Sequence, residues 1–278
     1  MTAFGPSLPR RTTLAPGVRR LLAPNPSMMT GPGTNTYLFG EQEIAVVDPG
    51  PAVAEHLDAI VDYAGAPIRW ILATHTHPDH SPGVAPLAER TGAEVLGRPA
   101  PEGSHQDPSF EPTRILGDGD ALVTGEFRLE AIHTPGHASN HLCYRHAPSN
   151  WVVTGDHVID GSTVVIDPPD GNMRDYLTSL ETLKCSGPDA LLPGHGDRID
   201  DPERVIEWII AHRLEREAKV AAALSSDPGS TIQALVVQVY AEVPATLHGL
   251  AERSLLAHLE KLVADGRANM TDERWYPT

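Results

Sequence analysis

Residues 75–80 read His-Thr-His-Pro-Asp-His and directly follow the apolar segment 68–73. This run places three imidazoles and one carboxylate within six residues. Imidazole nitrogens and carboxylate oxygens are ligands that Zn²⁺ takes in proteins. Because the apolar segment predicts a buried strand, side chains at its end would be held on a rigid support. The run therefore predicts a site for one metal ion or a pair of them.

Three downstream turns repeat this arrangement, in which an apolar segment ends at a Gly turn that carries a metal-binding residue type. Residues 134–137 read Thr-Pro-Gly-His, residues 154–156 read Thr-Gly-Asp, and residues 193–196 read Pro-Gly-His-Gly. In α/β folds, ligands commonly bind where strand ends meet at one edge of a sheet. We therefore expect seven side chains to converge on one site: His75, His77, Asp79, His80, His137, Asp156 and His195. The alternative, a loop of solvated histidines, does not explain the repeated context.

Hydrophobic periodicity predicts a mixed α/β fold. Strands are expected at 33–40, 44–47, 68–73, 121–123, 127–132, 142–145, 151–154 and 190–192, and helices at 52–64, 83–91 and 172–184. The Arg- and Pro-rich N-terminal region predicts an extended leader, because prolines break an amphipathic helix. After residue 202, helices at 203–224, 231–241 and 250–264 and a terminal hairpin are typical of a winged helix. We expect two domains, 1–202 and 203–278.

Composition excludes several classes of protein. The 278 residues carry a formal charge of −16, and no basic stripe is visible, which disfavours non-specific binding to nucleic acid. No apolar run reaches the length of a membrane span, so no membrane association is expected. The two cysteines, Cys143 and Cys185, cannot build a disulfide framework. This cysteine usage favours a cytoplasmic location.

Taken as a set, the four motifs resemble those of the metallo-β-lactamase superfamily. The resemblance covers about residues 20–200 and implies an α/β fold, an αββα sandwich with the metals at one edge, followed here by a small C-terminal winged-helix-like domain. It implies two Zn²⁺ ions, with Mn²⁺ or Fe as alternatives. One ion would be held by His75, His77 and His137, and the other by Asp79, His80 and His195, with Asp156 bridging. Asp48 resembles the carboxylate that orients a metal-binding histidine from outside.

The longer resemblance is to the lactamase-like endoribonuclease branch that carries a C-terminal winged helix. It rests on residues 33–38 (Gly-Thr-Asn-Thr-Tyr-Leu), residues 118–120 (Asp-Gly-Asp), and the helical pairs 212–213 and 216–217. It implies a phosphodiesterase that acts on single-stranded RNA. Similar sequences include acyl-carrier thioesterases, so a thioester hydrolase of the glyoxalase II or acyl-carrier type is the alternative. The substrate is thus expected to be a small molecule, a carrier-bound molecule or single-stranded RNA, and a homodimer is left open.

Two further functions rank lower. Many β-lactamases of this fold lack a bridging carboxylate at the position of Asp156, which points away from β-lactam hydrolysis. A winged-helix protein that only senses metal would need a purely structural metal site, which has no use for open coordination positions. The complete set of seven candidate ligands therefore predicts an enzyme and not a sensor.

The expected mechanism uses a metal-bound hydroxide as nucleophile, with Asp79 orienting it or carrying its proton. Ser81 and Ser139 lie near the ligands, but no elbow motif supports a Ser-His-Asp mechanism. We expect three nearby histidines to be structural or to support the ligands from outside: His133, His141 and His157.

One helical group leaves two interpretations open. His212, Arg213 and Arg216 fall on neighbouring helix positions, and Arg213 can pair with Glu217 at i,i+4. If this group overlooks the metals, its guanidinium groups could hold a phosphate or carboxylate. Otherwise it forms a solvated or interdomain ion-paired face.

Overall fold

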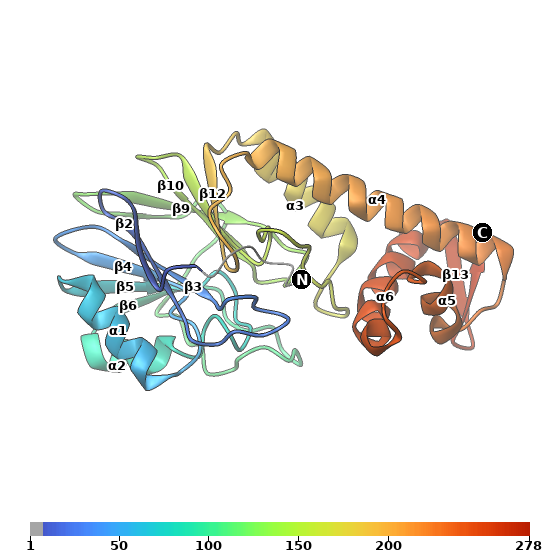
Figure 1. Cartoon of the computed structure of the whole chain (residues 1–278), viewed down its shortest axis with the longest axis horizontal. Helices are drawn as coiled ribbons and strands as arrows, with labels where there is room; N and C mark the ends of the chain where they lie inside the picture. The colour runs from blue at the N-terminus through green and yellow to red at the C-terminus, as the bar shows by residue number, and fades with distance from the viewer. Residues whose placement is uncertain (1–7) are drawn as a thin grey trace.

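The computed structural model describes residues 8–278, and two sheets packed face to face form its larger part (Figure 1). The first sheet has the order β1-β2-β3-β4-β5-β6-β7 and the second β12-β11-β10-β9-β8. The strands of the first sheet are β1 Arg11–Ala15, β2 Val18–Leu22, β3 Asn35–Phe39, β4 Ile44–Val47, β5 Ile68–Leu72, β6 Glu94–Gly97 and β7 Arg114–Ile115. Those of the second are β8 Ala121–Val123, β9 Arg128–His133, β10 Leu142–His146, β11 Trp151–Gly155 and β12 Ala190–Pro193.

Helices cover the outer face of each sheet (Figure 1). Helices α1 (Ala54–Ala64) and α2 (Val84–Thr91) bury Leu57, Ile60 and Leu87 on the first sheet. Helix α3 (Met173–Cys185) and the start of α4 (Pro202–Ser226) pack on the second. Between the sheets, alternate strand residues such as Phe39 and Leu129 form a shared core. The αββα sandwich expected from the sequence is confirmed.

The extended leader is a wrong prediction for residues 11–22. These residues form the hairpin β1–β2, in which Arg11 pairs with Leu21 and β2 also pairs with β3. Strand β2 is hard to predict from the sequence because it contains the charged residue Arg20, which is fully buried. Its Nη1 atom lies 2.7 Å from Oδ1 of Asp197. Residues 1–7 of the predicted leader lie outside the described residues. The short strands β6 and β7 at the other end of this sheet were likewise not predicted.

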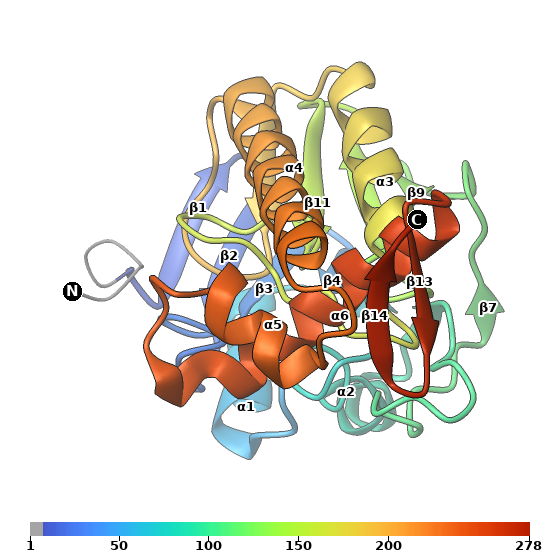
Figure 2. The ribbon, with the colours of Figure 1, turned by 90° about the vertical axis from the view of Figure 1, so that its right-hand side faces the viewer.

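The C-terminal part contains α5 (Ile232–Val239), a 3-10 turn (Ala245–Leu247), α6 (His248–Ala264) and the hairpin β13 (Ala268–Thr271)–β14 (Arg274–Pro277) (Figure 2). These elements surround their own core. Helix α4 belongs to both parts, since Ile206 and Ile209 pack beside α3 whereas Val220 and Leu224 pack with α5 and α6. The boundary at residue 202 stays a prediction. Within residues 8–278, no helix has the length and apolar character needed to cross a membrane.

Candidate metal centre

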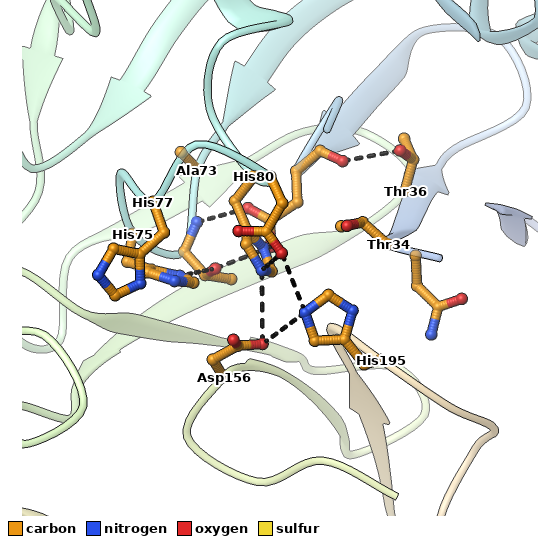
Figure 3. A network of polar contacts seen from close by, with 12 residues as sticks. Thr34, Thr36, Ala73, His75, His77, His80, Asp156 and His195 are labelled. Carbon is orange, nitrogen blue, oxygen red and sulfur yellow. Dashed lines mark hydrogen bonds and ion pairs between the residues drawn. The ribbon is translucent and has the colours of Figure 1, made fainter. Parts of the chain in front are cut away.

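The seven candidate ligands meet at one edge of the sandwich, where strands from both sheets end. Figure 3 shows how His75, His77, His80, Asp156 and His195 lie toward one another there. Strand β5 leads into the 75–80 loop, and β9, β11 and β12 lead to His137, Asp156 and His195. Their ligand atoms fall into overlapping groups, in each of which all atoms lie within 4.8 Å of one another. The structure therefore brings together the seven residues that the sequence proposed as metal ligands.

The first group consists of His75, His77 and His137. The Nδ1 atom of His77 lies 2.9 Å from Nε2 of His137. Burial lowers the pKa of His77 to about 3 and, together with the neighbouring histidines, holds the pKa of His75 well below its usual value. Neutral imidazoles are the form that binds a metal ion.

The second group consists of Asp79, His80 and His195. Nε2 of His195 lies 3.2 Å from Oδ2 of Asp79 and 3.3 Å from Oδ1 of Asp156. Asp156 reaches both groups, since its Oδ1 lies 3.4 Å from Nε2 of His80 and its Oδ2 lies 3.7 Å from Nε2 of His137. His75 also groups with His80 and Asp156, so it lies where the two groups adjoin.

Carboxylates give the second group a strongly negative potential. Burial works against protonation of His195, but Asp156 and Asp79 outweigh it and raise the pKa of His195 to about 9. Burial likewise opposes protonation of His80, yet the same two carboxylates and Asp48 raise its pKa well above the usual value. A site that favours the charged imidazole in this way attracts cations.

Contacts behind the imidazoles fix which ring nitrogen faces the centre. Asp48 accepts hydrogen bonds from Nδ1 of His80 at 2.9 Å and from the backbone N–H and hydroxyl of Thr74, both at 2.7 Å. Nδ1 of His137 donates to the carbonyl of Val165 at 2.7 Å, and Nδ1 of His195 contacts the carbonyl of Gly33 at 3.2 Å. In each case Nε2 is left pointing inward, as a metal ligand requires.

Two observations test whether these residues fit metal ions. Within the described part of the chain, Nε2 of His75, Nε2 of His80 and Oδ1 of Asp156 are buried and have no hydrogen-bond partner. Such atoms are costly unless something coordinates them. In addition, a Cβ at Gly194 would lie 2.8 Å from Oδ1 of Asp156, so glycine leaves room for the ligands. The donor set and the space both fit divalent ions.

The nearby serines and histidines do not form a second catalytic set. The hydroxyl of Ser81 donates to Asp107, and that of Ser139 donates to Asp170. His133 contacts the carbonyl of Ser139, whereas His141 is buried behind His75, with ring centroids 5.1 Å apart. His157 is fully buried against Tyr176. The hydroxyls of Ser81 and Ser139 thus bind carboxylates, and neither is aligned with a histidine as a nucleophile with its base.

The group around His212 does not line the cavity at the metal centre. Arg213 donates to the carbonyl of Val164 and lies over the ring of Tyr176, and Arg216 donates to the carbonyl of Val239 at 2.5 Å. The predicted Arg213–Glu217 pair is wrong, because Glu217 instead binds Lys261 and Arg267. Both arginines are buried and fasten α4 to its neighbours, so the group neither overlooks the metals nor forms the solvated face that was the alternative. An ion pair is present, but it joins Arg216 to Glu242 at 2.7 Å.

Several residues of the cavity had no signal in the sequence. The amide of Gln106 accepts from the backbone and hydroxyl of Thr76, between two candidate ligands, and donates to Asp170. Arg253 enters the cavity from α6. Both come from segments that carry no motif, and only the folded chain brings them to the site.

Comparison with known proteins agrees with this geometry. The family profile described as "Metallo-beta-lactamase superfamily" matches residues 29–195, and the "Beta-lactamase associated winged helix domain" matches residues 231–275. The "Beta-lactamase-like protein 2 homolog" of Drosophila melanogaster is 31% identical, over 97% of this chain and 96% of that protein. An "Atrochrysone carboxyl ACP thioesterase" of Aspergillus fumigatus is 31% identical, over 80% of this chain and 69% of that protein.

A crystal structure shows the same fold. A metallo-beta-lactamase family protein from Thermus thermophilus superimposes with a TM-score of 0.80 and 25% identity, over 96% of this chain and all of that one. Fold and site together define a metal-dependent hydrolase with a C-terminal winged helix. The chain belongs to the metallo-β-lactamase superfamily.

Proposed function

We propose that this protein is a two-metal thioester hydrolase whose substrate is a small or carrier-bound acyl thioester. His75, His77 and His137 would hold one ion and Asp79, His80 and His195 the other, and Asp156 reaches toward both groups. The observation that carries the proposal is the chemistry of the cavity in front of these residues.

The cavity has a volume of about 840 Å³, within the range of small-molecule sites. Part of its wall is apolar and suits an acyl chain. This wall contains Met29, Pro51, Pro78, Pro101, Val165, Pro168 and Pro169. An apolar wall beside the candidate metal ligands is what a hydrolase of acyl compounds needs.

The charge of the cavity opposes a polyanionic substrate. Five carboxylates line it: Asp79, Glu102, Asp156, Asp167 and Asp170. Among the described lining residues, Arg253 is the one Lys or Arg side chain. RNA binding relies on several basic contacts to phosphates. The predicted action on single-stranded RNA therefore finds no support in the wall, and the thioester alternative fits better.

When bound, the two ions polarise the scissile carbonyl and lower the pKa of water toward neutrality. The chain's own residues position the reactants. Asp79 faces the cavity and contacts His195 through Oδ2, so its Oδ1 can orient the attacking water and take its proton. Zn²⁺ is the proposed metal, with Mn²⁺ or Fe as alternatives.

The thioesterase name of the Aspergillus fumigatus relative supports this choice of substrate class. A cytoplasmic location, in keeping with the free Cys143 and Cys185, belongs to the same proposal. The state of assembly, monomer or homodimer, does not alter it.

The experiment compares three substrates with one metal-loaded preparation: an acyl thioester, single-stranded RNA and a β-lactam. We expect thioester hydrolysis that His77→Ala reduces by at least about a hundredfold. The matched control is His212→Ala, because His212 lies outside the cavity and should leave the rate unchanged. Cleavage of RNA without thioester hydrolysis would replace this proposal with the endoribonuclease.

A further inference from the structure

The C-terminal part of the chain contributes to the cavity at the metal centre. Of the described lining residues, Arg253 alone lies beyond residue 195, and it comes from α6. Helix α6 is held against the catalytic part, since Ala257 packs in the core formed around α3. At its end, Asp265 pairs with Arg174 of α3. The helix that carries Arg253 is therefore fixed beside the cavity by these contacts.

Helix α6 of the winged helix packs against the protein and is not presented for insertion into DNA. In helix-turn-helix units, the second helix enters the major groove. Here α6 buries Ala251, Ser254, Leu255, Ala257, His258, Leu259 and Leu262. With this face packed against the rest of the protein, α6 places Arg253 at the cavity. This placement gives the winged helix a side chain that can contact the substrate.

Breaking the ion pair between Arg253 and Asp167 costs little free energy. Nη1 of Arg253 lies 3.1 Å from Oδ2 of Asp167, and the two side chains are 57% and 43% exposed. Ion pairs exposed to this degree contribute between about 0 and 1 kcal/mol. A guanidinium group offers several donors and binds phosphate well, often through two parallel hydrogen bonds. An anionic group of a substrate can thus replace or join Asp167.

From these observations we infer that Arg253 is a specificity-determining residue, which binds the phosphate of the phosphopantetheine arm that carries the acyl thioester. The inference rests on the proposed function. Thioesters in metabolism are carried on this arm by coenzyme A or by carrier proteins, and both place a phosphate at the far end from the sulfur. Among the described residues that line the cavity, Arg253 is the one Lys or Arg side chain, so it is the residue there that can bind this phosphate through a charged hydrogen bond.

The test uses two substrates that differ only in the phosphate, an acyl-pantetheine and the same acyl-4′-phosphopantetheine. The readout is the ratio of kcat/KM for the phosphorylated substrate to that for the unphosphorylated one. Arg253→Met should lower this ratio about tenfold, mainly through KM, because a hydrogen-bonded charge contact is lost. Arg253→Lys should restore part of it, because the charge is kept.

A matched control comes from the second ion pair between α6 and the catalytic part. Arg174→Met breaks the pair with Asp265 outside the cavity, so the ratio should stay at the wild-type value. Asp167→Asn should raise the ratio, because it removes the competing carboxylate. Acyl-coenzyme A and an acylated carrier protein, assayed in parallel, then distinguish the free from the protein-borne source of the phosphate.

The outcomes separate the two proposals. If wild-type protein hydrolyses both substrates and Arg253→Met leaves the ratio unchanged, this inference is wrong and the thioesterase stands. If Arg174→Met lowers the ratio as much as Arg253→Met does, the effect belongs to the domain contact and the inference also fails. If metal-loaded wild-type protein hydrolyses neither substrate, both proposals fall.

Discussion

The carboxylate of Asp48 gives a sharp test of how the chain prepares its metal ligands. It is buried and accepts three hydrogen bonds, from Nδ1 of His80 and from two groups of Thr74. Asp48 has a φ of 52°, a backbone conformation that Asn tolerates, so Asp48→Asn preserves the backbone. The amide, however, keeps one acceptor oxygen, so its NH2 group meets a donor in either orientation, the ring N–H of His80 or the backbone N–H of Thr74.

The size of the effect follows from these contacts. When the NH2 group faces His80, the Nδ1 proton of His80 is left unsatisfied or moves to Nε2, the nitrogen that faces the metal. When it faces Thr74, the loop that carries the candidate ligands loses the hydrogen bond from the Thr74 N–H. Loss of such an outer partner typically costs about 10- to 100-fold in metal affinity, or about 1.4–2.8 kcal/mol. The ion at His80 should suffer most, whereas the ion held by His75, His77 and His137 should lose less.

The assay titrates metal-free protein with Zn²⁺ against a chromophoric chelator, which gives the number of ions bound and both dissociation constants. The control is Asp62→Asn, an exposed carboxylate that pairs with Arg11 away from the site. Weaker binding of one ion in Asp48→Asn alone is the predicted result. If both dissociation constants stay within about twofold of wild type, the reasoning about this carboxylate is refuted.

Three further changes extend the account. Asp156→Ala should reduce the bound metal from two ions to one or none by elemental analysis, because its carboxylate reaches both groups; two retained ions would show that it bridges nothing. Gly194→Ala should weaken metal binding roughly tenfold, because the new methyl group would meet the candidate ligands. In the control, Gly249→Ala, the methyl group meets nothing, so the variant should bind metal as wild type does. Equal affinities of the two variants would refute the claim that Gly194 leaves room for the ligands. Burial, followed by two nearby arginines, lowers the pKa of His258 to about 3, so protonation at acid pH favours unfolding. The free energy of unfolding should therefore fall as the pH drops below 6.5 toward 3, by up to about 1.4 kcal/mol per pH unit from this group. His258→Leu should reduce this pH dependence, measured by urea denaturation. The same pH dependence in wild type and variant would contradict the prediction.

The candidate ligands could be predicted from the sequence because each motif is local. The 75–80 run and the glycine turns before His137, Asp156 and His195 lie at strand ends, and strand ends meet at an edge. Asp48, which directly follows strand β4, also lies at a strand end, and the family resemblance implied that it supports the ligands. Apolar segments of strand length separated by helical ones predicted a mixed α/β fold, and the family resemblance implied the sandwich. The strands that periodicity predicted formed close to the expected positions.

Other features depend on contacts between distant segments and leave no local pattern. The strand β2 contains adjacent arginines and reads as polar, yet Arg20 is buried because Asp197, far along the chain, pairs with it. The wall of the cavity is made largely of loops, and neither Gln106 nor Arg253 carries a motif. The pair predicted between Arg213 and Glu217 follows helix spacing correctly, but Lys261 and Arg267 compete for the same carboxylate.

The central claim is that seven side chains hold two metal ions side by side at the edge of the sandwich. Anomalous diffraction from crystals of metal-loaded protein tests it most directly. The account predicts two peaks, one among His75, His77 and His137 and one among Asp79, His80 and His195, with Asp156 between them. A preparation that is catalytically active and shows no peak among these residues, or peaks only elsewhere, would contradict it.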